Sequence, residues 1–167
     1  MLKAIIFDMD GVIIDSEPAH ARAALSVFSS HGINVDTGYC NSFIGSSTKN
    51  MCEDAIKRFG IDITTSALLN EMNKAKSDIV KKEGYIIIDG VQELVKKLYK
   101  AGYKLAVASS SSPVEIEDTV KALGIRKYFN KLVSSSNVKN PKPAPDTFEL
   151  ALSKLGVSAK ETIVIED

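Results

Sequence analysis

Ala4-Ile5-Ile6-Phe7-Asp8-Met9-Asp10-Gly11 is the stretch of sequence that decides the fold of this chain. Its first four residues form a short apolar run, which predicts a strand buried on both faces. The run ends at two carboxylates, Asp8 and Asp10. Because ligands of an open parallel sheet bind at the carboxyl ends of its strands, we expect both carboxylates to face one site.

Three further apolar runs predict strands over residues 105–108, 131–133 and 162–165. Helical periodicity predicts helices over residues 91–101, 113–123 and 146–155. A glycine follows each of these helices, and Asp89 is the candidate N-cap of the first. Strands that alternate with helices at this spacing predict an α/β fold with a Rossmann-like parallel sheet.

The segment from residue 16 to residue 84 differs from the rest because it holds helical patterns and no convincing strand. The patterns cover residues 17–30, 48–59 and 66–82. We therefore predict two domains. Residues 1–15 and 85–167 form a discontinuous α/β core, and residues 16–84 form a helical domain inserted after the first strand.

Composition narrows the range of functions. The chain has 21 basic and 21 acidic residues, so no overall field attracts it to nucleic acid or to an anionic membrane. Cys40 and Cys52 lack the CxxC spacing of a zinc site, and we interpret both as packing residues. With no apolar run long enough to be a signal peptide or a membrane span, we expect a cytoplasmic protein. The sequence leaves its oligomeric state open.

Asp8 and Asp10 are suited to two steps of one reaction. A carboxylate can attack phosphorus and form an acyl-phosphate. A second carboxylate two residues on can protonate the leaving group and later activate water or an acceptor hydroxyl. Asp-x-Asp-Gly also suits a turn or a Ca²⁺ loop, so the neighbouring strand ends have to decide between these interpretations.

A serine run at residues 109–112 follows the strand predicted at 105–108. A hydroxyl at a strand end, with backbone N–H groups at the start of the next helix, can bind a phosphate. Ser112 is equally suited to cap the helix that begins at Pro113. We predict Ser109 as the phosphate ligand, with Ser110 beside it in the substrate site. A second run, at 134–136, is interpreted as a loop.

Lys142 lies in Asn140-Pro141-Lys142-Pro143-Ala144-Pro145-Asp146, where prolines restrict the backbone on both sides. A lysine fixed beside the nucleophile can offset the charge of a phosphate, although a solvated lysine in a proline loop has the same sequence. The strand at 162–165 ends in Glu166 and Asp167. An acidic strand end facing Asp8 suits Mg²⁺, which prefers oxygen ligands.

These motifs together resemble the four signature motifs of the haloacid-dehalogenase-like superfamily, in order and over essentially the whole chain. They are Asp8-x-Asp10, Ser109 after an apolar strand, Lys142 in Lys-Pro-Ala-Pro-Asp, and Glu166-Asp167. The segment 7–17 and the helical insert resemble the subgroup that contains β-phosphoglucomutase and sugar-phosphate phosphatases. The resemblance implies a Mg²⁺-dependent enzyme that acts on a small phosphorylated metabolite through an aspartyl-phosphate, with the insert as a mobile cap.

The resemblance also implies roles for individual residues of the core. Asp8 is the nucleophile and a metal ligand, and Asp10 is the acid/base and a metal ligand through its backbone. Ser109 and Lys142 bind the phosphate. Asp167 binds Mg²⁺, and Glu166 lies near the metal.

In the cap, the resemblance places His20, Lys76 and Gly45 at positions that contact substrate or couple cap closure to the acid/base. His20 is equally compatible with an ordinary helix surface. The arginine that grips the distal phosphate of a sugar bisphosphate in the mutase is replaced by Thr48, with Lys49 beside it. Lysine cannot reproduce the two-pronged contact of an arginine.

Hydrolysis of a phosphate monoester is the leading prediction, and phosphosugar mutation of the β-phosphoglucomutase type is the alternative. A 2-haloacid dehalogenase has no need of Asp10 or of an acidic metal site, and a domain that only binds phosphorylated ligands does not need intact Asp8 and Asp10. Family members continue beyond the Glu-Asp pair into a further helix and strand. We therefore expect the strand at 162–165 to be an apolar sheet edge beside the first strand, and the chain to be incomplete at its C-terminal end or prone to aggregate.

Overall fold

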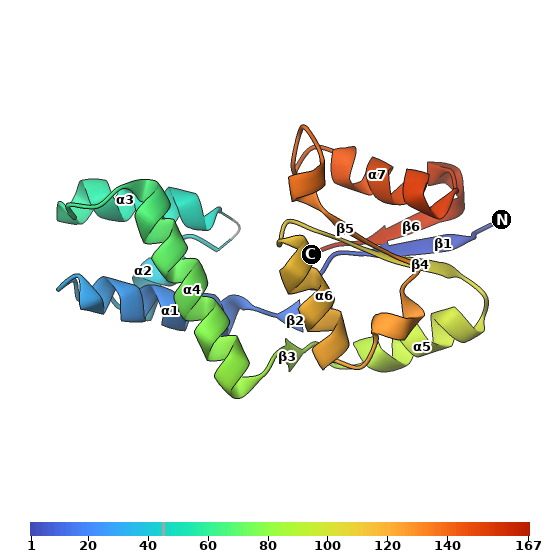
Figure 1. Ribbon diagram of the computed structural model, residues 1–167, viewed down its shortest axis with the longest axis horizontal. Helices are drawn as coiled ribbons and strands as arrows, with labels where there is room; N and C mark the ends of the chain where they lie inside the picture. The colour runs from blue at the N-terminus through green and yellow to red at the C-terminus, as the bar shows by residue number, and fades with distance from the viewer. Residues whose placement is uncertain (45) are drawn as a thin grey trace. The chain divides into compact units, whose positions relative to one another are not determined.

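The computed structural model describes residues 1–44 and 46–167, which form two compact units (Figure 1). Met1–Asp15 and Tyr85–Asp167 form one unit, called here the core unit, and Ser16–Gly84 form the other, called the helical unit. Gly45, which was predicted to contact substrate, lies outside the described residues.

The core unit is built on a four-stranded parallel sheet with the strand order β5-β4-β1-β6. The strands are β1 (Ala4–Phe7), β4 (Lys104–Ser109), β5 (Lys131–Ser134) and β6 (Thr162–Ile165). The predicted α/β class with a parallel sheet is therefore confirmed. As expected, β6 lies at the sheet edge beside β1, with Ile163 and Val164 exposed.

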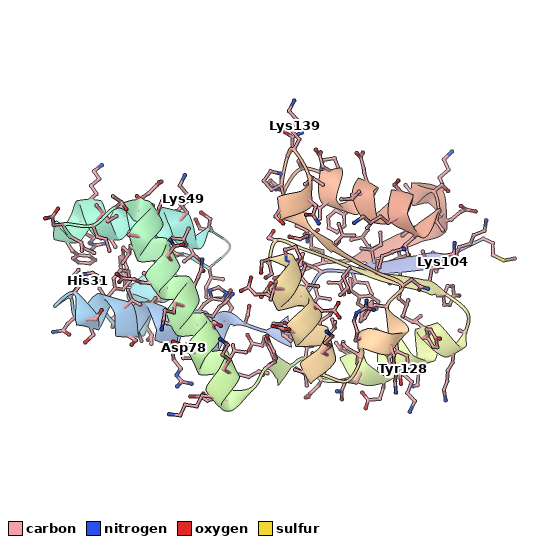
Figure 2. The ribbon with its side chains drawn as sticks, viewed as in Figure 1. His31, Lys49, Asp78, Lys104, Tyr128 and Lys139 are labelled. Carbon is pink, nitrogen blue, oxygen red and sulfur yellow. The ribbon has the colours of Figure 1, made fainter. Side chains whose placement is uncertain are left out.

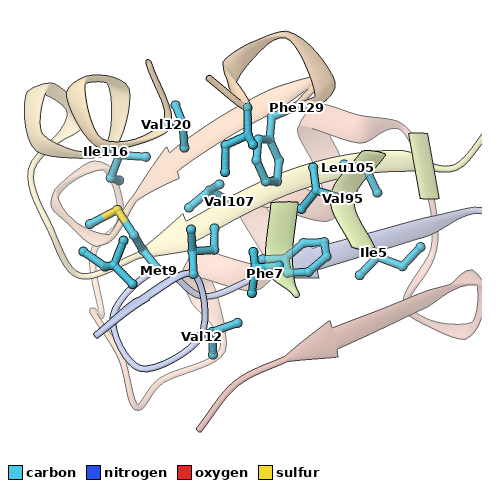
Figure 3. Close-up of a cluster of buried hydrophobic side chains, with 14 residues drawn as sticks. Ile5, Phe7, Met9, Val12, Val95, Leu105, Val107, Ile116, Val120 and Phe129 are labelled. Carbon is cyan, nitrogen blue, oxygen red and sulfur yellow. The ribbon is translucent and has the colours of Figure 1, made fainter. Parts of the chain in front are cut away.

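Side chains alternate between the two faces of β1, and helices cover both faces (Figure 1). Ile5 and Phe7 pack in one cluster with residues of α5 (Val91–Lys100) and α6 (Pro113–Ala122), as Figure 3 shows. Ala4 and Ile6 pack on the opposite face against α7 (Asp146–Leu155). Burial on both faces is the reason that β1 has no polar residue.

The starts of two helices test the predicted caps. Ser112 caps α6 in a capping box, in which its hydroxyl accepts from the Glu115 N–H while the Glu115 carboxylate accepts from the Ser112 N–H. The prediction for α5 is wrong, because its N-cap is Gly90 rather than Asp89. Gly90 has a φ of +82°, a left-handed conformation that favours glycine, so the backbone itself turns the chain into the helix.

The helical unit contains α1 (Glu17–Ser30), α2 (Thr37–Asn41), α3 (Thr48–Phe59) and α4 (Thr65–Glu83). The three predicted helices are thus present, and α2 was missed because five residues are too few to show a periodic pattern. Cys40 and Cys52 are free thiols buried in the core of this unit, which confirms them as packing residues. Burial raises the pKa of the Cys52 thiol to about 11.

Several short elements complete the chain. An antiparallel pair, β2 (Ile14–Asp15) with β3 (Ile86–Ile87), lies where the chain leaves and re-enters the core unit. The described part of the chain also has the 3₁₀ turns η1 (Arg126–Tyr128), η2 (Ser135–Asn137) and η3 (Ala159–Glu161). The interpretation of residues 134–136 as a loop is corrected, because Ser134 ends β5 and the next two serines begin η2. Within residues 1–44 and 46–167, no helix has both the length and the apolar character needed to cross a membrane.

Candidate active site

The loop after β1 is a tight turn that carries both predicted carboxylates. The Met9 carbonyl accepts the N–H groups of Ile13 and Ile14, at 2.8 and 3.0 Å. Gly11 has a φ of +76°, and a Cβ at this position would overlap the Asp167 carboxylate. The acidic end of β6 therefore lies directly against the backbone of the β1 loop.

Asp8 is buried and forms an ion pair with Lys142. The distance from Lys142 Nζ to Asp8 Oδ2 is 3.0 Å, and the two side chains are only 11% and 12% exposed, respectively. Burial raises the pKa of Asp8, since it penalises the charged carboxylate. Lys142 and the Met9 N–H, which donates to Asp8 Oδ1 at 2.7 Å, oppose this shift.

Lys142 is itself fixed by two further groups. Its ammonium donates to Glu166 Oε1 at 3.1 Å and lies 4.5 Å from the centre of the Phe148 ring. The face of an aromatic ring attracts a cation. Asp8, Glu166 and Phe148, from three parts of the chain, thus contact one positive charge. Glu166 is engaged with the lysine, and its assignment to the metal stays a prediction.

Ser109 ends β4 and is fully buried. Its hydroxyl oxygen accepts from the Ser111 N–H at 3.0 Å, so its own proton is not used in that bond. The Ser111 hydroxyl donates to Asp10 Oδ2 at 3.1 Å. Sequence reasoning missed Ser111, although its place in the serine run was a signal. Ser110, between them, is exposed.

The donor set of the core unit suits Mg²⁺ in its chemistry. Asp8 and Asp167 offer carboxylate oxygens and Asp10 offers its backbone carbonyl, on two neighbouring strand ends. Among the described residues, no three side chains of His, Cys, Asp or Glu are grouped closely enough to hold an ion. Mg²⁺ commonly uses one or two carboxylates and completes its shell with water and substrate phosphate, so it does not require such a group.

The predicted cap residues belong to the helical unit. His20 is on α1 and Lys76 is on α4, both half-buried. Lys49 is exposed on α3 and pairs with Glu53 one turn on, at 3.5 Å (Figure 2).

The fold and the cluster at the strand ends together define an α/β enzyme of the phosphatase and phosphomutase class. The haloacid dehalogenase-like hydrolase family matches residues 5–167, and the chain belongs to this family.

Named relatives agree with this class. The chain is 33% identical to the fructose-1-phosphate phosphatase YqaB of Escherichia coli, over 98% of this chain and 85% of that protein. It is 28% identical to a phosphorylated carbohydrates phosphatase of Thermotoga maritima, over 99% of this chain and 76% of that protein. A crystal structure of a Thermotoga maritima protein provisionally named β-phosphoglucomutase matches with a TM-score of 0.83 and 27% identity, over 99% of this chain and 76% of that one.

The raised pKa of Asp8 predicts a pH dependence of stability. In the folded protein Asp8 binds its proton more tightly than in the unfolded chain, so this contribution to stability is present in acid and is lost as the pH rises through the folded-state pKa. Asp8→Asn cannot titrate. In metal-free buffer, we expect the free energy of unfolding of the wild type, minus that of Asp8→Asn, to fall as the pH rises from below 3.8 to neutrality.

Urea unfolding at a series of pH values measures this difference. Asp78→Asn is the control, because the pKa of the exposed Asp78 is lowered by Lys74 and its contribution has the opposite sign. A difference for Asp8→Asn that stays flat or rises with pH would contradict the shift.

Proposed function

We propose that this enzyme hydrolyses a small phosphorylated sugar or a related phosphate monoester through an aspartyl-phosphate on Asp8. The observation that carries the proposal is the buried ion pair of Asp8 with Lys142 at the end of β1, with Asp10 two residues on. A carboxylate in this setting is shielded from bulk water, and the ammonium beside it can also contact a bound phosphate.

In the first step, an Asp8 carboxylate oxygen attacks phosphorus. The new O–P bond forms as the bond from phosphorus to the leaving oxygen breaks, and Asp10 supplies the proton that this oxygen takes up. In the second step, Asp10 removes a proton from water, which attacks the same phosphorus. The bond to Asp8 then breaks, and inorganic phosphate leaves.

Lys142 and Ser109 would bind the phosphoryl oxygens during both steps. The Lys142 ammonium reduces the repulsion between the Asp8 carboxylate and the anionic substrate. The Ser109 hydroxyl already accepts from Ser111, which leaves its proton for a phosphoryl oxygen. Mg²⁺ held by Asp8, Asp167 and the Asp10 carbonyl would supply further positive charge at the phosphate.

Two named relatives act on phosphorylated sugars or carbohydrates by hydrolysis, which favours this substrate class. Phosphosugar mutation is the second candidate, supported by the provisional name of the Thermotoga maritima structure and by the positions of His20 and Lys76 in the sequence. Thr48 in place of the expected arginine favours hydrolysis, because a second phosphate would lack its two-pronged ligand. The helical unit as a mobile cap, and a cytoplasmic location, belong to the same proposal.

The first test is a panel of sugar phosphates that includes fructose 1-phosphate and β-glucose 1-phosphate. We expect release of inorganic phosphate without an isomerised sugar phosphate. Asp8→Asn should reduce the rate to background while its unfolding curve stays cooperative, because the amide keeps the shape of the side chain and loses the attacking charge. Isomerised product formed from β-glucose 1-phosphate with a bisphosphate primer would favour the mutase. Substantial residual turnover in Asp8→Asn would exclude the mechanism.

The second test concerns Mg²⁺. We expect chelation to stop turnover and added Mg²⁺ to restore it. Gly11→Ala should raise the Mg²⁺ concentration for half-maximal rate by about tenfold or more, because the new methyl group displaces the Asp167 carboxylate.

Gly156→Ala is the matched control for Gly11→Ala. Gly156 also has a left-handed φ, +64°, but a Cβ there meets nothing within 4 Å. Both variants therefore carry the backbone cost, and only Gly11→Ala disturbs Asp167. Equal Mg²⁺ requirements in the two variants would remove Asp167 from the metal site.

A further inference from the structure

Ser134 is a buried hydroxyl that none of the steps above uses. It is the last residue of β5 and is 1% exposed. Its hydroxyl donates to the carbonyl oxygen of Ser111 at 2.7 Å, which joins the end of β5 to the loop after β4. The hydroxyl of a buried serine often donates to a carbonyl of its own segment. The Ser134 hydroxyl instead donates to a carbonyl of the neighbouring loop, and this choice needs a physical explanation.

The direction of each hydrogen bond around Ser134 follows from counting protons. A carbonyl only accepts, so the one hydroxyl proton of Ser134 is committed to Ser111. The hydroxyl of Ser136, 2.9 Å away, must therefore donate to Ser134 Oγ, and the Ser136 N–H donates to the same oxygen at 3.2 Å. Ser134 is thus oriented by the first turn of η2.

Ser111 is consequently held through all of its polar groups. Its N–H donates to Ser109, its carbonyl accepts from Ser134, and its hydroxyl donates to Asp10 Oδ2. With its backbone fixed at both the N–H and the carbonyl, Ser111 directs its hydroxyl at one oxygen of Asp10. While Oδ2 accepts this bond, the proton that Asp10 delivers as an acid lies on Oδ1.

We propose that Ser134 is a positioning residue for the acid/base step. It holds the Ser111 carbonyl, and Ser111 in turn fixes which Asp10 oxygen carries the transferable proton and where that oxygen points. The inference rests on the proposed function, since it assigns Ser134 to the acid step of that mechanism. Proton transfer requires donor and acceptor within hydrogen-bond reach, so a small displacement of the loop slows the reaction strongly.

The experiment compares substrates that differ in their need for the acid. A sugar alkoxide is a poor leaving group and requires protonation, whereas p-nitrophenolate leaves without it. Because kcat/KM reports on the step in which the leaving group departs, Ser134→Ala should lower kcat/KM for the sugar phosphate by about tenfold or more, and for p-nitrophenyl phosphate by less than about threefold. A purely structural role would lower both values equally.

Ser135→Ala is the matched control. Ser135 is also buried, and its hydroxyl pairs with Thr147 at 2.9 Å rather than with the loop after β4. Ser135→Ala should lower the melting temperature without changing the ratio of the two kcat/KM values. In the Ser111→Ala background, adding Ser134→Ala should change the ratio no further, because the link to Asp10 is already broken. An unchanged ratio in Ser134→Ala, or independent effects in the double variant, would overturn the proposal.

Hydrogen exchange provides a readout that does not depend on turnover. We expect the amides of residues 109–112 to exchange faster in Ser134→Ala than in the wild type, and at the wild-type rate in Ser135→Ala. If Ser134→Ala does not fold, Ser136→Ala replaces it, because Ser136 is exposed and its hydroxyl is one donor to Ser134. Ser136→Ala should change the exchange of amides 109–112 and the ratio of the two kcat/KM values in the same direction as Ser134→Ala. If the wild-type protein has no phosphatase activity, only the proposed function is wrong. If hydrogen exchange is unchanged in Ser134→Ala and in Ser136→Ala, the role of Ser134 is wrong.

Discussion

The buried ion pair between Asp8 and Lys142 is the constraint on which the rest of the site depends. Taking a carboxylate out of water is costly, and the raised pKa of Asp8 shows that burial outweighs the stabilising effect of its partners. Lys142 therefore has to be held closely, and Glu166, just after β6, and the Phe148 ring of α7 do so. In the proposed function, this unfavourable buried charge is the one that attacks phosphorus.

Side-chain contacts also connect the carboxyl ends of the strands across the sheet. Asp10 is bonded to Ser111 after β4, Ser111 is bonded to Ser134 at the end of β5, and the Asp167 carboxylate lies against Gly11 after β1. Polar contacts thus join the ends of β1, β4 and β5, and the end of β6 lies against the loop after β1. A parallel sheet makes this possible because its carboxyl ends lie side by side, whereas the residues that they carry are far apart in the chain.

In the proposed function, the residues that carry out the reaction and the residues that select the substrate belong to different parts of the chain. Asp8, Asp10, Ser109 and Lys142 all belong to the core unit, and the residues proposed to contact the sugar belong to the helical unit. A separate recognition unit can change its side chains without disturbing the buried charges around the nucleophile. This separation is consistent with the range of phosphorylated substrates that the names of the relatives describe.

The sequence by itself determined the strands of the parallel sheet and the long helices, because each has a local signal, such as the apolar run of β1, the period of α3 or Ser112 as the candidate N-cap before Pro113. It also indicated Asp8 and Ser109 from the strand ends that they follow, and Lys142 from the prolines on both sides of it. Local patterns failed where they were too short, as in α2 and β2, or where the backbone replaced a side chain, as at Gly90. The bonds from Ser111 to Asp10 and from Ser134 to Ser111 span 101 and 23 residues. Only the tertiary structure decided them, because they depend on which strand ends are neighbours in the sheet, and that order is a property of the packed core rather than of any segment.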